Sequence, residues 1–236
     1  MLMKPALPRL LSAEILDDLD EHDPRAVRSR RDLRLINRIM GSAGILARAL
    51  AAAPAAPERI IEFGAGDGEL MLRLARQLSS RWPRVHVVLL DCKDLVAPET
   101  REGFARTGWT VETLQADIED WVDQAAEQRF DIALANLFIH HFNSGQIGQL
   151  FDAVSKRADM LVACEPRRAR LALLASRMVG LLGANEVTRT DAVLSVRAGF
   201  DGRELSELWP AAASDWELNE RHAGLFSHLF VARRKR

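Results

Sequence analysis

The residues with the clearest chemical potential lie in one glycine-rich segment. Residues 61–69 read IEFGAGDGE, an apolar run that leads into three alternating glycines. Gly64, Gly66 and Gly68 lack a Cβ, so their backbone can adopt positive φ and a ligand can lie against it. The first amides of a following helix would favour a carboxylate or another anion. The segment is therefore a candidate ligand-binding turn.

The spacing of these glycines departs from that of a dinucleotide-binding turn. The pattern GxGxxG, begun at Gly64, would place its third glycine at position 69, where the sequence has Glu69. An acidic residue, Glu62, precedes the first glycine at the end of the expected strand. A second acidic residue, Asp91, ends the next expected strand, where a carboxylate can accept both hydroxyls of a ribose. A carboxylate at this position could bind the ribose of NAD as well as that of another nucleoside. Asp91 therefore does not distinguish between these ligands.

Short apolar runs alternate with amphipathic windows from residue 59 onward, which is typical of a parallel sheet with crossover helices. The expected parallel strands cover residues 59–63, 85–91, 109–114, 130–136 and 160–165. The runs 216–221 and 224–234 predict an antiparallel hairpin that closes one edge of the sheet.

Helical periodicity fills the segments between these strands. We expect a helix over 69–78 and another that is capped by Asn143 and Ser144. A further helix is expected to carry Leu171, Leu174, Met178 and Leu182. A polar region follows it, and Asp201 is expected to begin one more helix. Residues 1–57 predict an N-terminal helical extension that ends in a proline-containing linker, and residues 58–236 predict the main domain.

The ExGxGxG arrangement at residues 62–68 resembles motif I of class I S-adenosylmethionine-dependent methyltransferases. The segments QADI (115–118) and FDIALANLFIHHF (130–142) are similar to later motifs of the same family. The resemblance is closest to bacterial small-molecule methyltransferases that act on phenols or quinols. It implies an α/β fold, a doubly wound Rossmann-like sandwich with a mostly parallel seven-stranded sheet, an antiparallel C-terminal hairpin and an N-terminal helical extension.

The resemblance also implies S-adenosylmethionine as the cofactor and S-adenosylhomocysteine as its product. The glycine turn would hold the amino-acid end and the ribose, and Asp117 would bind the adenine amino group unless it only caps the helix that begins at Ile118. Asn136 would face the methyl group and the acceptor. The expected cofactor-binding residues are Glu62, Phe63, Gly64, Ala65, Gly66, Gly68, Asp91, Cys92, Asp117, Ile118 and Asn136.

Methyl transfer from a sulfonium mainly requires alignment of the reactants and exclusion of water, so a nucleophile triad is not needed. If the acceptor is a hydroxyl, His140 and His141 are the candidate bases, because an imidazole with a pKa of ~6.5 can take a phenol proton at neutral pH. Both could instead be ordinary polar residues at a helix entrance. Neighbouring side chains point in different directions, so we expect no metal site at this pair.

The composition is that of an ordinary globular protein, with 48% hydrophobic and 28% charged residues. The formal net charge of -1 provides no general positive field, so we do not expect a nucleic-acid partner. The resemblance implies a small-molecule acceptor instead. No apolar run reaches the ~18 residues of a membrane span, and the two cysteines suit a reducing compartment. We therefore expect a cytoplasmic protein that is not bound to membranes and is a monomer or a homodimer.

Two alternatives to a methyltransferase remain at this point. An NAD(P)-dependent oxidoreductase would share the layered architecture, but the glycine spacing disfavours it, and a sequence with no tyrosine lacks the Tyr-x-x-x-Lys pair of some such enzymes. A non-catalytic cofactor-binding protein of the same fold would keep the acidic positions without turnover.

Overall fold

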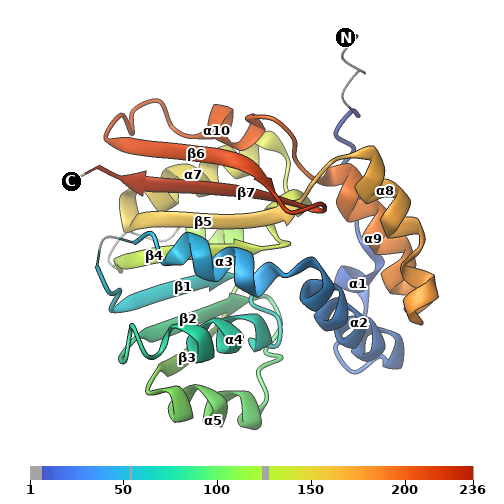
Figure 1. Ribbon diagram of the computed structural model, residues 1–236, viewed down its shortest axis with the longest axis horizontal. Helices are drawn as coiled ribbons and strands as arrows, with labels where there is room; N and C mark the ends of the chain where they lie inside the picture. Colours follow the sequence, from blue (N-terminus) through green and yellow to red (C-terminus); the bar gives the residue numbers. More distant parts are fainter. Residues whose placement is uncertain (1–6, 54, 124–127, 236) are drawn as a thin grey trace.

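A seven-stranded sheet forms the centre of the molecule, with helices on both of its faces (Figure 1). The computed structural model describes residues 7–53, 55–123 and 128–235. The strand order is β3-β2-β1-β4-β5-β7-β6, in which β1 to β5 are parallel and β7 is antiparallel to both of its neighbours. The expected fold class, including the C-terminal hairpin, is confirmed.

The strands lie close to their expected positions. They are β1 (Arg59–Phe63), β2 (His86–Asp91), β3 (Thr110–Gln115), β4 (Phe130–Asn136), β5 (Ala158–Pro166), β6 (Trp216–Ala223) and β7 (Ser227–Arg234). The central strands β1, β4 and β5 are almost entirely buried, since helices cover both faces of a parallel sheet. The strand order reverses between β1 and β4, so a ligand crevice is expected at the carboxyl ends of these two strands.

The helices occupy both faces and one end of the sheet. They are α1 (Ile15–Asp18), α2 (Pro24–Met40), α3 (Ser42–Leu50), α4 (Glu69–Leu78), α5 (Pro98–Thr107), α6 (Ile118–Asp123), α7 (Ser144–Arg157), α8 (Arg170–Arg177), α9 (Glu186–Ala198) and α10 (Glu204–Leu208), with short 3-10 turns η1 (Ile139–His141) and η2 (Val179–Leu182). The expected helix at 69–78 is confirmed. Asn143 caps α7 through a reciprocal capping box with Gln146, as its position predicts.

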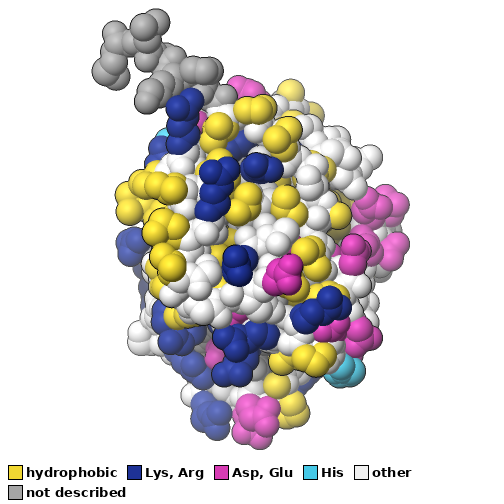
Figure 2. Space-filling view, turned by 90° about the vertical axis from the view of Figure 1, so that its right-hand side faces the viewer, with side chains coloured by type: hydrophobic (Ala, Val, Ile, Leu, Met, Phe, Trp, Pro, Cys, Tyr) yellow, Lys and Arg dark blue, Asp and Glu magenta, His cyan; other side chains and the backbone are white. Residues whose placement is uncertain are grey.

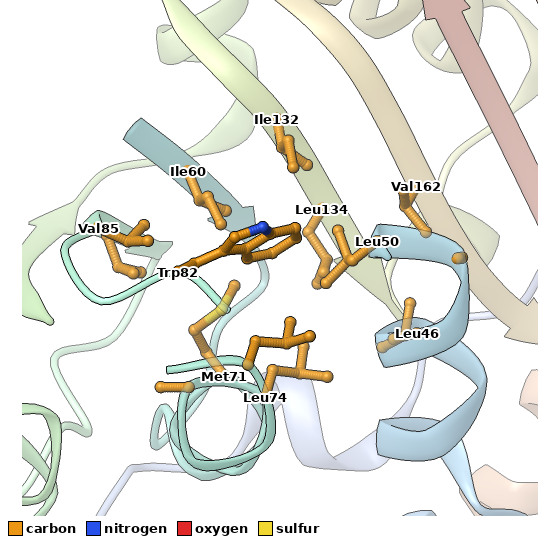
Figure 3. Packing of buried hydrophobic residues seen from close by; sticks show 14 of the residues in the cluster. Leu46, Leu50, Ile60, Met71, Leu74, Trp82, Val85, Ile132, Leu134 and Val162 are labelled. Carbon is orange, nitrogen blue, oxygen red and sulfur yellow. The ribbon is translucent and has the colours of Figure 1, made fainter. Parts of the chain in front are cut away.

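Two apolar clusters hold the layers together. One cluster lies between the sheet and helices α3, α4 and α5, and Figure 3 shows the Trp82 ring between Ile60 and Leu134 of the sheet and Met71 of α4. The other lies on the opposite face and includes Phe151 of α7. Both faces of the sheet are thus sealed, which leaves its carboxyl edge as the place for a ligand.

The segment between β5 and β6 differs from its prediction. The expected helix through Leu171 and Met178 ends at Arg177 and continues only as η2, and its apolar stripe is exposed. Figure 2 views this side of the molecule and shows hydrophobic side chains at the surface among Lys and Arg. The expected polar region contains α9, and the helix expected from Asp201 begins at Glu204.

The reason that α9 was not predicted is chemical. Its buried face carries Thr188 and Asp191, so it has no continuous apolar stripe. The Thr188 hydroxyl lies 2.9 Å from the hydroxyl of Ser29 in α2, and the Asp191 carboxylate accepts the amides of Ile15 and Leu16 in α1 at 2.9 and 3.0 Å. Polar contacts with the N-terminal helices therefore replace a hydrophobic face.

The N-terminal helices pack in two different places. Helices α1 and α2 contact α9 beyond the carboxyl ends of the parallel strands (Figure 1), whereas α3 packs into the core through Leu46 and Leu50. Residues 1–6 and 54 of the predicted extension and Arg236 of the C-terminal basic run lie outside the described residues. A domain boundary at residue 57 stays a prediction.

No helix in the described part of the chain is both long enough and apolar enough to cross a bilayer.

Replacing Leu46 by alanine tests whether α3 belongs to the core. The Leu46 side chain is fully buried, so Leu46→Ala should lower the free energy of unfolding by about 2–5 kcal/mol through lost burial and a cavity. Ile39→Ala in α2, at a residue that is 55% exposed, is the matched control and should change it by about 0.5 kcal/mol or less. Equal effects in urea unfolding would contradict the core role of α3.

Candidate active site

The glycine-rich turn between β1 and α4 has the backbone that its sequence predicts. Gly64, Gly66 and Gly68 have φ of 64°, 56° and 72°, values that other residues rarely adopt. A Cβ on Gly64 would lie 2.2 Å from the ring of Phe138, whereas a Cβ on Gly66 would meet nothing within 4 Å. The turn therefore packs under an aromatic ring at one glycine and faces open space at the other.

A cavity of about 450 Å³ opens at the carboxyl edge of the sheet, a volume typical of small-molecule sites. Most of the residues expected from the sequence line it: Glu62, Gly64, Ala65, Gly66, Asp91, Cys92, Asp117, Ile118, Asn136, His140 and His141. Phe63 does not line it, because its buried ring packs against Trp121 at 4.8 Å between centroids. Gly68 does not line it either: it is the N-cap of α4, and a Cβ on it would lie 2.9 Å from the side chain of Leu89.

Glu62 lies at the bottom of this cavity with an unsatisfied carboxyl group. The residue is 2% exposed, and its Oε2 has no hydrogen-bond partner among the described residues. Burial, followed by the charges of Asp67 and Asp91, raises the pKa of Glu62 well above its ordinary value. A buried polar group without a partner is costly, so this end of the cavity is suited to a ligand that carries a hydrogen-bond donor or a positive charge.

The two acidic residues expected to bind a nucleoside both make backbone contacts. Oδ2 of Asp91 accepts the amide of Gly66 at 2.8 Å, and its Oδ1 accepts the amide of Lys93 at 3.0 Å. Oδ1 of Asp117 accepts the amide of Glu119 at 2.8 Å and so caps α6. These bonds fix both carboxylates at the cavity wall.

Strained backbone follows β4 at the opposite wall. Leu137 has φ of 52°, the one positive value at a non-glycine residue in the described part of the chain. Such strain costs about 1–3 kcal/mol and persists only where surrounding contacts enforce it. Here the Leu137 amide donates to the Cys164 carbonyl at 3.0 Å, and the Asn136 side-chain amide donates to Oδ1 of Asn37 in α2 at 3.2 Å. The strained turn directs the following residues into the cavity.

Glu165 holds that turn from β5. Its fully buried carboxylate accepts the amides of Phe138, at 3.2 Å, and Ile139, at 2.9 Å, and lies 2.8 Å from Nδ1 of His140. On the other side of the ring, Nε2 of His140 lies 3.4 Å from Oε1 of Glu14. Burial alone would lower the pKa of His140, but its contacts with Glu14 and Glu165 raise it to about 9.

His141 lies beside His140 and not away from it. The ring centroids are 4.3 Å apart, so the expectation that the two side chains diverge is wrong. Both imidazoles turn toward carboxylates of the N-terminal segment, His140 toward Glu14 and His141 toward Asp17, and this brings the two rings together. Nδ1 of His141 lies 3.2 Å from Oδ2 of Asp17 in α1.

Several residues at this site were not found from the sequence. Glu14 and Asp17 come from the N-terminal segment, where nothing local marks them as site residues. Glu165 lies at the end of an expected strand, as Glu62 and Asp91 do. This position is the feature of the sequence that could have marked Glu165 as a site residue. Arg34 of α2, for which the sequence left open a place over the acceptor or on an exposed charged face, pairs with Asp67 of the glycine turn and lines the cavity.

Comparison with known proteins identifies the domain that this site belongs to. Residues 60–158, which carry the glycine turn and the strained segment after β4, match the family described as methyltransferase domain. The glycine turn and the strained segment thus lie in a stretch that matches a methyltransferase domain. The match includes Glu62, Asp91, Asp117 and the two histidines.

The similar proteins are methyltransferases. Malonyl-(acyl-carrier protein) O-methyltransferase of Paenibacillus sp. (strain JDR-2) is 30% identical over 79 residues, which are 33% of this chain and 27% of that protein. The plantazolicin methyltransferase BpumL, solved with S-adenosylhomocysteine, superposes with a TM-score of 0.64 at 11% identity over 91% of this chain and 92% of its own. An O-methyltransferase family protein from Burkholderia thailandensis gives 0.57 at 15% identity, over 91% of this chain and 61% of its own.

These matches bear on the alternatives raised by the sequence. The solved structures share the fold of the methyltransferase domain, and they extend this fold over most of the chain. Neither an NAD(P)-dependent oxidoreductase nor a non-catalytic cofactor-binding protein is favoured. The aligned part covers about a quarter of the curated relative, so the activity of the whole protein is taken up below as a proposal.

The raised pKa of His140 predicts a pH-dependent contribution to stability. A proton bound more tightly in the folded state stabilises it fully below the unfolded pKa of ~6.5, and this stabilisation is lost as pH rises through about 9. The difference in unfolding free energy between wild type and His140→Asn should therefore shrink between pH ~6 and ~9.5. His22→Asn, at an exposed histidine, is the control, and a constant difference for His140→Asn would contradict the assignment.

Proposed function

We propose that the protein transfers the methyl group of S-adenosylmethionine to a hydroxyl oxygen of a small phenol or quinol. The observation that carries this proposal is the cavity itself, which has a glycine turn with an unpaired carboxyl at one wall and a buried histidine at the other. The cofactor supplies an activated methyl group bonded to a positively charged sulfur. All other requirements fall to the protein: binding, alignment, exclusion of water and removal of one proton.

The cofactor side of the cavity fits the chemistry of this nucleoside. Gly66 leaves its surface open, so a ligand can lie against the turn, and the start of α4 favours a carboxylate. Asp91, held by two backbone amides, would accept ribose hydroxyls, and Ile118 would pack on the base with Asp117 at its edge. Glu62 would interact with a positively charged group of the ligand, which would relieve its unpaired burial.

The acceptor side supplies a base and a partly aromatic wall. As the methyl carbon bonds to the acceptor oxygen and separates from sulfur, the hydroxyl proton would pass to Nε2 of His140. Nδ1 of the same ring is held by Glu165, which orients the imidazole as a positioning residue. Phe138 and Phe142, whose ring centroids lie 5.0 Å apart, line the cavity nearby and suit an aromatic acceptor.

Two of the matched proteins support oxygen as the accepting atom. The relative from Paenibacillus and the structure from Burkholderia thailandensis are both described as O-methyltransferases. Since His140 is a base suited to removing a hydroxyl proton, a hydroxyl acceptor is the simplest match to both observations. Cytoplasmic location and a monomeric or dimeric state complete the proposal.

Cofactor binding is tested by calorimetry with S-adenosylhomocysteine. Asp91→Ala removes the expected ribose contact and the bond to Gly66, so it should weaken binding by about 10- to 150-fold, the equivalent of ~1.5–3 kcal/mol for a charge-assisted hydrogen bond. Asp94→Ala, at an exposed carboxylate that pairs with Arg101, is the matched control and should leave the affinity unchanged. Equal affinities of wild type and Asp91→Ala would rule out this binding mode.

Catalysis is tested with a panel of phenols, amines and thiols and radiolabelled cofactor. The wild-type kcat/KM for a phenol should rise with pH toward about 9, because only the neutral form of His140 accepts a proton. His140→Gln should lower kcat by about 10²–10⁴-fold and abolish that rise while S-adenosylhomocysteine still binds. A pH profile that is the same in wild type and His140→Gln would show that another group is the base.

A further inference from the structure

Three side chains at the acceptor end of the cavity form a compact set of potential metal ligands. Glu14, His140 and His141 each offer one donor atom, and these atoms all lie within 4.8 Å of one another. Glu14 and His140 are buried, and His141 is partly buried. Two imidazoles and one carboxylate are a donor set that occurs at protein zinc sites.

His140 has the environment of a metal ligand on both of its ring nitrogens. Nδ1 lies 2.8 Å from the carboxylate of Glu165, which would fix the ring and place the lone pair of the neutral imidazole on Nε2. Nε2 is buried, has no hydrogen-bond partner among the described residues and lies 3.4 Å from Oε1 of Glu14. A carboxylate behind a histidine, with the other nitrogen free, is the usual outer support of a metal-bound imidazole.

The charges around the set also favour a cation. The carboxylates of Glu14, Asp17 and Glu165 all face the two histidines, at 2.8 to 3.4 Å. Over residues 7–53, 55–123 and 128–235, their ion pairs are with these histidines and not with Lys or Arg. Two cations near this set bind backbone oxygens instead: Arg9 donates to the carbonyls of His140 and Phe142, and Lys93 to those of Asp17 and Leu19.

We propose that Glu14, His140 and His141 bind one divalent transition-metal ion, with Zn²⁺ as the best match to this donor set. Asp17, which contacts His141, would support the site from the N-terminal segment. The ion would bind the neutral imidazole at Nε2, so binding to the protonated form of His140 would release the Nε2 proton. This inference replaces the sequence-based expectation that the histidine pair holds no metal.

The site lines the cavity that also contains the glycine turn, so a bound ion would have an open position toward an acceptor. On the proposed function, a hydroxyl bound to the ion would lose its proton more readily, because a Lewis acid lowers the pKa of a bound oxygen. The ion would then take over the part that the Nε2 atom of His140 plays in its absence.

The test uses the full chain without a histidine tag, stripped with a chelator and titrated with Zn²⁺ by calorimetry, with Co²⁺ as a spectroscopic probe. One equivalent of Zn²⁺ should bind. Co²⁺ bound at the same site should give visible absorption bands typical of coordination by nitrogen and oxygen ligands. Glu14→Gln and His141→Ala should each weaken Zn²⁺ binding by about tenfold or more. His222→Ala, which removes a histidine paired with Asp201 outside the set, is the matched control and should leave it unchanged.

The outcomes separate this inference from the proposed function. Binding of S-adenosylhomocysteine by each variant shows that the chain is folded and reports on the cofactor site alone. If that ligand binds but Zn²⁺ does not, or if Zn²⁺ binding is the same in wild type, Glu14→Gln and His141→Ala, the metal site is wrong while the proposed function stands. If Zn²⁺ binds as expected and S-adenosylhomocysteine does not, the proposed function fails and the metal site stands.

Discussion

The buried carboxylate of Glu165 is the contact on which the acceptor side of the cavity depends. It joins the end of β5 to the turn after β4 through the amides of Phe138 and Ile139, and it orients the ring of His140. These bonds offset the strain at Leu137, whose φ of 52° directs the turn into the cavity. A residue without an acceptor oxygen at position 165 would leave the buried amides of Phe138 and Ile139 unpaired, so the wall and the orientation of the histidine would be lost together.

Two buried glutamates, Glu62 in the lining of the cavity and Glu165 behind it, differ in their hydrogen bonding. Glu165 is surrounded by donors, whereas Glu62, at the end of β1, leaves Oε2 without one. Both residues end parallel strands, so the difference comes from the loops that follow: a turn that bends its amides toward Glu165, and a glycine turn whose Gly66 amide goes to Asp91 instead. The fold thus satisfies one carboxyl internally and leaves the other for a ligand.

The sequence predicts those parts of the structure that depend on local pattern. Each strand and the helix at 69–78 follow from apolar periodicity, and the positive φ of Gly64 and Gly66 follows from the glycines themselves. Helix α9 was missed because its buried face is polar and gains its partners from α1 and α2, far away in the chain. Glu14 was missed for the same reason: only the folded chain brings it to His140.

The carboxylate of Asp191 has a consequence for how the molecule is assembled. It binds the first amides of α1, so the segment that carries Glu14 and Asp17 is fastened by a residue 176 positions later in the chain. During synthesis from the N-terminus, the segment with Glu14 and Asp17 leaves the ribosome first. It cannot be fixed in place until Asp191 of α9 has also been made. The N-terminal side of the acceptor site, with Glu14 and Asp17, is therefore among the latest features to be fixed in place, and a truncated chain that stops before α9 would leave it unanchored even if β1 to β5 had already paired.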